Sequence, residues 1–393
     1  MLTSPLTRLK NNFLDLLEHK TTLLAVLYHF VLVIIIFLPC LLNGSVFIGS
    51  EDNYTHHFAN LFFNLKSAQH GDMGLWNPYI YGGTNFSAST HNFIFYPFNW
   101  ILFLFPQKLF LSVLTLRIFL ETWAIGYFGF LLFKEEIKNV RWALFASTIY
   151  LLGGHTILGL TIYANLTVTL WITIGAYLIF SMARRSYVRS FLYLTFTVLC
   201  LHFCFNIVYS LAGLLILSIL FIYKFFETFL KSPARWKYAA TFILGMLTGT
   251  MISLIKLFPV LYRIMFEGTR IANTNYEPLH HGILFFLSAF IPETFGVNMN
   301  QSLQYLTELG GKPVSSHVET FSYFGLLPIF LIFYSFFHLK DKKIMFWMLY
   351  LSITSLWFLN IHPVVDILNK LTYPLIHIII PKIMIPIPLC MLA

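Results

Sequence analysis

Long apolar runs alternate with short polar turns along nearly the whole chain. A helix needs about 20 apolar residues to cross a hydrocarbon core of about 30 Å, and many of these runs reach that length. A membrane β-barrel would instead alternate apolar and polar residues. The pattern therefore predicts an all-α polytopic membrane protein with spans at roughly residues 21–43, 109–133, 142–160, 166–183, 190–206, 207–223, 238–260, 321–338 and 344–361.

The first apolar run, residues 21–43, is longer than the core of a signal peptide, and no small-x-small cleavage site follows it. We interpret it as a retained anchor. Residues 1–393 then form a single transmembrane domain, with two long polar loops at about residues 44–108 and 261–320 and no separate soluble domain.

Basic residues gather in the short turns that lie on one side of these predicted spans. By the positive-inside rule this side is the cytoplasm, so the N-terminus is expected inside and both long loops outside. The same placement argues against nucleic acid as a partner, although the net charge is +9. The clusters are Arg8, Lys10 and Lys20; Lys134, Lys138 and Arg141; Arg184, Arg185 and Arg189; Lys224, Lys231, Arg235 and Lys237; and Lys340, Lys342 and Lys343.

Only the two external loops carry enough polar side chains for an active site. The cytoplasmic turns contain no phosphate-binding loop and no dinucleotide fingerprint, and the sequence predicts no cofactor. An enzyme of this kind would have to receive its activated substrate through the lipid. Membrane lipids are therefore expected partners.

The first external loop begins with two carboxylates, Glu51 and Asp52, directly after the first span. Apolar residues at spacings of three and four over residues 53–70 predict an amphipathic helix along the membrane interface. Asp52 at its start is either a helix cap or a general base that acts on a lipid-borne substrate. His56 lies four residues after Asp52, but the adjacent His57 cannot share its helix face, so we predict no metal site.

The rest of this loop combines turn signals with interfacial aromatic residues. Trp76, Asn77 and Tyr79 surround the turn at Pro78, and they are candidates for substrate binding. Residues 93–105 are apolar but too short to span, which predicts a second interfacial or re-entrant helix.

Arginines at two further places could contact a substrate, or they could have a purely structural or lipid-contacting role. Arg263 and Arg270, just outside a span, can hold a phosphate through paired N–H donors, or they can simply contact lipid headgroups. Arg117 and Glu121 lie inside the second span at a spacing of four. They form either an internal ion pair or a substrate contact.

Several stretches, in order from residue 20 to about 380, resemble the YfhO-like bacterial membrane proteins of the GT-C glycosyltransferase superfamily. They are "SEDNYTHHF", "GDMGLWNPYIYGGTNF", "FYPFNWILFLFP", "LFPVLYRIMFEGTR", "FFLSAFIPETFG" and "VETFSYFGLLPIFL". The residues of the first loop that match the family pattern are Asp52, Gly71, Leu75, Trp76, Asn77, Pro78, Tyr79, Gly83, Phe86, Tyr96 and Pro97.

The resemblance implies a GT-C-like helical bundle in the bacterial cytoplasmic membrane. It implies an enzyme that moves a sugar from a polyprenyl-phosphate donor to an envelope glycan or lipid acceptor at the outer face. Asp52 would be the catalytic base, with Glu51 as the less favoured neighbour. Members of the family usually run to about twice this length, so an inactive, truncated transferase is one alternative. A transporter or flippase for a lipid-linked precursor is another.

Overall fold

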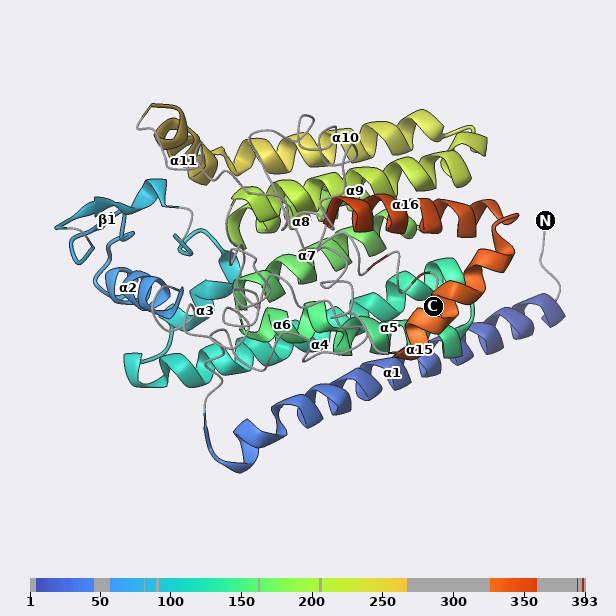
Figure 1. The fold of residues 1–393 in the computed structure, drawn as a ribbon, viewed down its shortest axis with the longest axis horizontal. Coiled ribbons are helices and arrows are strands. Elements are labelled where there is room, and N and C mark those ends of the chain that lie inside the picture. The colour runs from blue at the N-terminus through green and yellow to red at the C-terminus, as the bar shows by residue number, and fades with distance from the viewer. Residues whose placement is uncertain are drawn as a thin grey trace, which may run out of the picture.

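A computed structural model describes residues 5–45, 57–80, 82–89, 92–161, 163–204, 207–266 and 326–358, together with residues 387 and 391. This part of the chain is mainly helical (Figure 1). Its α-helices are α1 (Pro5–Leu42), α2 (Phe58–Gln69), α3 (Trp100–Phe103), α4 (Phe110–Ile137), α5 (Val140–Leu152), α6 (Gly154–Thr161), α7 (Tyr163–Phe180), α8 (Tyr187–Cys204), α9 (Ile207–Glu227), α10 (Arg235–Ile252), α11 (Leu254–Phe266), α15 (Leu326–Ser335) and α16 (Lys342–Phe358).

Short elements connect these helices. Two strands, β1 (Trp76–Asn77) and β2 (Thr84–Asn85), pair as an antiparallel hairpin. The 3₁₀ helices are η2 (Phe86–Ala88), η3 (Pro97–Asn99), η4 (Gln107–Leu109), η5 (Met182–Arg184), η6 (Phe229–Lys231) and η8 (Phe336–His338).

Within the described residues, 4 helices are long and apolar enough to cross a membrane. They cover Lys20–Leu42, Gln107–Ile137, Tyr187–Cys204 and Tyr209–Glu227, and they agree with four of the predicted spans. The predicted α-helical architecture with several potential membrane spans is thereby confirmed for this part of the chain.

Other predicted spans differ from the structure. The run predicted at residues 142–160 is divided at Gly153 into α5 and α6, because adjacent glycines at this point weaken a continuous helix. The run at 238–260 is also broken, since α10 and α11 meet at an angle of 66°. At this break the hydroxyl of Ser253 donates a hydrogen bond to the Gly249 carbonyl at 2.7 Å, a contact that favours bending.

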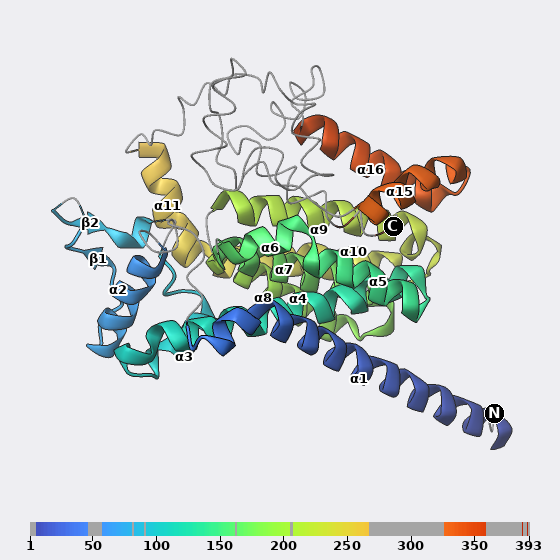
Figure 2. The same ribbon diagram turned by 60° about the horizontal axis from the view of Figure 1, so that its bottom comes forward.

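The helices form a bundle with α4 and α7 near its centre (Figure 1). Helix α7 packs against α4, α8 and α9, while α10 lies along α8. Helix α1 contacts α4 from the edge of the bundle, and its N-terminal half extends beyond the other helices (Figure 2). The hairpin, α2, α3 and α11 gather at one end of the bundle, and we call this the loop end. We call the opposite end, which carries the basic turns, the basic end.

Candidate functional site

The amphipathic helix predicted over residues 53–70 of the first loop is present as α2, which covers Phe58–Gln69. Phe58, Leu61 and Leu65 are buried, as the spacing predicts. Asn60 and Asn64 are buried as well. The Asn64 amide group faces that of Asn92 at 3.3 Å, and this contact joins α2 to the end of the loop. A polar contact therefore holds the loop together within its apolar packing.

The turn at Trp76, Asn77 and Tyr79 is part of the β1–β2 hairpin. Asn77 is buried, and its side-chain oxygen accepts a hydrogen bond from the Tyr79 backbone N–H at 2.9 Å. This contact is typical of an Asx turn, so Asn77 shapes the loop. The side chains of Trp76 and Tyr79 are 59% and 83% exposed, respectively. Of the three predicted substrate-binding residues, these two present open aromatic surfaces.

Gly83 permits the Trp76 ring to lie across the hairpin. Its φ is +118°, and an added Cβ would lie 2.6 Å from the ring of Trp76. A residue with a side chain would be strained in its backbone and would also collide with the indole. The second glycine of the "YGG" stretch, Gly83, is therefore required by the conformation of the hairpin and by the position of the Trp76 ring.

The structure brings the helix that carries Arg263 against the first loop. Helix α11 packs on η2 (Phe86–Ala88), which directly follows the hairpin. Arg263 is half-buried in the last turn of α11. Helix α11, which leads into the second predicted loop, and η2 of the first loop therefore lie at the same end of the bundle (Figure 1).

Four predicted site residues lie outside the described residues: Glu51, Asp52, His56 and Arg270. His57, next to His56, is buried, and its ring meets that of Phe93 edge to face at 5.9 Å. This histidine packs within the loop. The predicted second interfacial element at residues 93–105 consists of η3 and the four-residue α3, so it is shorter and less regular than expected.

A buried charged cluster lies beneath the loop. The Nε of Arg117 lies 3.2 Å from Oε1 of Glu121, which confirms the predicted internal ion pair. Arg117 also donates hydrogen bonds to Oδ1 of Asn99 and, at 3.3 Å, to the hydroxyl of Thr167. The Thr167 hydroxyl in turn donates to Oε2 of Glu121 at 2.8 Å. Helices α4 and α7 and the first loop thus share one network.

Tyr96 adds a second link from the loop to this cluster. Its hydroxyl donates to Oε1 of Glu121 at 3.2 Å and accepts a hydrogen bond from the indole N–H of Trp171 at 3.0 Å. The sequence analysis names Tyr96 as a match to the family pattern but gives it no partner in α4. Tyr96 and Asn99, which contacts Arg117, both lie in the "YPFN" turn, and this pair of polar groups is the sequence signal for the two contacts.

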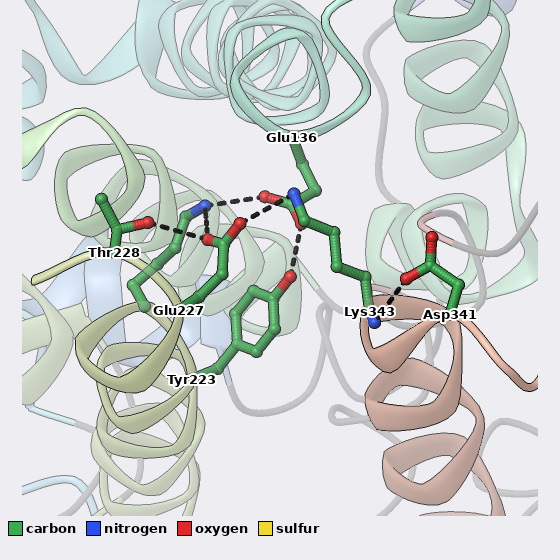
Figure 3. A network of polar contacts seen from close by, with 7 residues as sticks. Glu136, Tyr223, Glu227, Thr228, Asp341 and Lys343 are labelled. Carbon is green, nitrogen blue, oxygen red and sulfur yellow. Dashed lines mark hydrogen bonds and ion pairs between the residues drawn. The ribbon is translucent and has the colours of Figure 1, made fainter. Parts of the chain in front are cut away.

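The basic end contains a second charged cluster that the sequence did not predict (Figure 3). Lys224 Nζ lies 2.8 Å from Glu136 and 2.6 Å from Glu227. Lys343 approaches the same two carboxylates, at 3.4 Å from Glu136 and 2.7 Å from Glu227. The hydroxyl of Tyr223 donates to Glu136 at 2.5 Å. We call Glu136, Lys224, Glu227 and Lys343 the charge quartet.

The quartet joins α16 to α4 and α9. Burial lowers the pKa of Lys343, but the hydrogen bond and charge of Glu227 and the charge of Glu136 outweigh that effect and raise the pKa above its ordinary value. Lys343 is therefore held in its charged form. The Tyr223 ring also stacks on Phe346 of α16 at 4.3 Å, which supports the same contact between helices.

Among the residues that the structure describes, no group of three or more His, Cys, Asp or Glu side chains could hold a metal ion. No protein-family model, curated protein or solved structure matches the chain.

Proposed function

We propose that the chain is a membrane glycosyltransferase that moves a sugar from a polyprenyl-phosphate donor to an envelope glycan or lipid at the outer face of a bacterial cytoplasmic membrane. The observation that carries the proposal is the packing of α11, with Arg263, on η2 of the first loop. Arg263, the cation that we propose to hold the phosphate, therefore lies on a helix that contacts the loop following the Glu51–Asp52 pair.

The form of α11 suits a lipid-borne donor. Its exposed side carries Ile255, Phe258, Tyr262 and Phe266, whereas Leu257 and Val260 are buried. Because the axis of α11 turns by 66° from that of α10, this apolar face can lie along a membrane surface. Arg263 would then reside at headgroup depth, where its planar fork of N–H groups can hold a phosphate.

In this proposal Asp52 is the catalytic base or the group that orients the acceptor hydroxyl, and Arg263, with Arg270 from the second loop, holds the phosphate of the leaving group. Trp76 and Tyr79 offer aromatic faces to the sugar. The resemblance to YfhO-like proteins supports these roles, with Asp52, Trp76 and Tyr79 at positions of the family pattern.

The test is the transfer of labelled sugar from polyprenyl-phosphate hexoses to envelope glycan or lipid acceptors, with polyprenyl phosphate as the leaving group, by the full chain in proteoliposomes that contain these acceptors. Asp52→Asn is expected to lower turnover by roughly 10²-fold, the scale for loss of a positioned base. The protein should still fold, since Asn also caps helices well. Asp72→Asn is the matched control, because Asp72 is an exposed carboxylate of the same loop, and it should keep full activity.

Full sugar transfer by the Asp52→Asn variant would reject the proposed base. If the chain transfers no sugar to the acceptors but moves a fluorescent polyprenyl-phosphate donor between leaflets, the transporter alternative is correct. An Arg263→Lys variant with unchanged donor affinity would remove Arg263 from the phosphate site, because a lysine cannot reproduce the two-pronged contact.

A further inference from the structure

Lys256, in the first turn of α11, is a buried cation that the proposed transferase does not use. Its side chain is 2% exposed, and its Nζ donates a hydrogen bond to the Phe203 carbonyl oxygen at 3.2 Å. A charged group inside a membrane protein is costly, and it usually pairs with other charges or with backbone carbonyls. A lysine kept in this position at that cost is expected to have a function.

The carbonyl that Lys256 contacts lies at the C-terminal end of α8. Phe203 is the second-last residue of this helix, so no N–H group of the same helix can reach its carbonyl oxygen. The aligned peptide dipoles also give this end of a helix a partial negative charge. The ammonium group of Lys256 therefore binds a carbonyl and offsets the partial charge, and it ties α11 to a segment 53 residues earlier in the chain.

Further contacts make the last turn of α8 a fixed base. The Nδ1 of His202 lies 3.2 Å from the hydroxyl of Ser210 in α9, and its Nε2 lies 3.2 Å from the hydroxyl of Thr250 in α10. The centre of the Phe203 ring lies 5.8 Å from that of Phe95 in the first loop. An attachment to this turn therefore holds α11 relative to two neighbouring helices and to the first loop.

Helix α11 needs such an attachment because its own structure does not fix its direction. It has 13 residues, close to the length at which isolated helices are marginal, and it contains Pro259. Proline has no N–H to donate to the Ile255 carbonyl one turn earlier, which weakens the helix further. The axis of α11 also turns by 66° from that of α10, so contacts with other elements must set its direction.

The face of α11 that carries Lys256 also carries Arg263. The two residues are seven positions apart, with Val260 between them, and this spacing places all three on one side of a helix. Lys256 and Val260 are buried and Arg263 is half-buried, whereas Phe258 and Tyr262 on the other side are 65% and 52% exposed. At a rise of 1.5 Å per residue, Arg263 lies about 10 Å beyond Lys256 along the helix axis. The rotation of α11 about its axis therefore decides whether Arg263 faces the bundle or the lipid.

We propose that Lys256 is a positioning residue for Arg263. Its ammonium group, held on the end of α8, fixes the direction and rotation of α11 and keeps the Arg263 side of this helix toward the bundle, where α11 packs on η2. The role of Arg263 as the phosphate ligand rests on the proposed function, but the attachment of α11 by Lys256 can be measured without it.

The first measurement is the distance between spin labels on the two helices. In a chain without its four native cysteines, the labels are attached at Tyr262→Cys of α11 and Leu192→Cys of α8, whose native side chains are 52% and 54% exposed. A narrow distance distribution is expected when Lys256 is present. Lys256→Met should broaden or shift the distribution, and Lys256→Arg, which keeps a cationic donor, should restore it.

The second measurement is the affinity of the full chain in lipid nanodiscs for a fluorescent polyprenyl-phosphate glucose. Lys256→Met is expected to weaken binding about tenfold, the scale of one hydrogen bond to a charged group, because Arg263 is no longer held in place. Lys256→Arg should keep most of the affinity. The matched control is Lys108→Met, the same change at an exposed lysine of the loop end, and it should bind the donor as the wild type does.

Thermal unfolding separates positioning from a general structural role. Methionine removes a buried charge at nearly the same volume, so Lys256→Met should fold with a midpoint close to that of the wild type. An unchanged distance and an unchanged donor affinity in Lys256→Met, whatever its midpoint, would overturn the positioning role. An equal loss of affinity in Lys108→Met would show that cations of the loop end attract the donor in general, which would also overturn it. If the wild-type chain binds no donor, the proposed phosphate site is rejected, and the distance alone then decides whether Lys256 holds α11.

Discussion

In both charged clusters, the buried charged side chains form ion pairs and hydrogen bonds that offset the free-energy cost of removing them from water. Arg117 and Glu121 are both buried in α4, where an isolated charge would be expensive, and each finds hydrogen-bond partners on neighbouring elements. The spacing of four residues made this pair predictable from the sequence. In the charge quartet only the Lys224–Glu227 contact, at a spacing of three in α9, has such a local signal. Glu136 of α4 and Lys343 of α16 are far from α9 in the chain, so their contacts were not predictable.

The Arg117–Glu121 pair should behave as a coupled unit. Arg117→Ala or Glu121→Ala leaves one buried charge without its partner, so each change should lower the free energy of unfolding by about 3–5 kcal/mol. The double variant should lose less than the sum of the two. Unfolding by SDS titration in micelles measures these values. Ser218→Ala, which removes a hydroxyl that donates to the Leu214 carbonyl of its own helix at 2.8 Å, is the mild control. Strict additivity would contradict the coupling.

At the scale of whole helices, hydropathy located the spans but not their interruptions. The runs at 21–43, 109–133, 190–206 and 207–223 correspond to helices long enough to cross a membrane, because length and apolarity are local properties. The break at Gly153 coincides with two adjacent glycines, and a hydrogen bond from Ser253 accompanies the 66° bend after α10. Hydropathy averaged over a window of residues detects neither feature. Hydropathy also predicted an interfacial helix over residues 93–105, but the α-helix in this segment, α3, covers only Trp100–Phe103.

The candidate site was predictable only in part. The residue types of the first loop indicated an aromatic turn and an amphipathic helix, and both are present. The buried role of Asn77 and the links from Tyr96 and Asn99 to α4 depend on contacts between distant segments. A single sequence does not reveal such contacts, since many partners would satisfy the same polar groups.

The packing of α8 on α10 depends on small residues. A Cβ at Gly249 would lie 2.7 Å from the Thr195 carbonyl oxygen and equally close to Val198. Gly249 and Gly245 lie four residues apart on the buried face of α10, a spacing that lets helix backbones approach closely in membranes. This contact fixes how near the two helices can lie.

Gly249→Ala should therefore weaken the α8–α10 contact despite the better helix propensity of alanine. Overpacking costs about 1–3 kcal/mol, against a gain of about 1 kcal/mol from propensity. We expect a net loss of about 1 kcal/mol in the free energy of unfolding. Leu247→Ala, on the exposed side of α10, is the control and should change it by less. A Gly249→Ala variant more stable than wild type would show that the two helices can separate at little cost.

For the molecule as a whole, the two ends of the bundle differ in chemistry. The loop end has exposed aromatic side chains and the buried amides of the first loop, whereas the basic end has the lysine-rich turns and a cavity of about 750 Å³. The positive-inside rule predicts that the basic end faces the cytoplasm and that the first loop faces outward. The proposed transferase requires this orientation, because its lipid-linked donor and its acceptor are both expected at the outer face.

Cysteine labelling in intact cells tests this orientation. The four native cysteines, Cys40, Cys200, Cys204 and Cys390, are first replaced by alanine. Tyr79→Cys, at an 83% exposed side chain of the hairpin, should react with a membrane-impermeant maleimide added outside. Ser186→Cys and Asn139→Cys, both exposed at the basic end, should react only after the membrane is permeabilised. Outside labelling of Ser186→Cys with protection of Tyr79→Cys would show the opposite orientation, with the first loop on the cytoplasmic side and away from the outer face, where the proposed transfer takes place. Tyr79 and Asn139 lie before and after α4, so they must be on opposite sides of the bilayer if α4 crosses it. Labelling of Tyr79→Cys and Asn139→Cys from the same side would therefore show that α4 does not span the membrane.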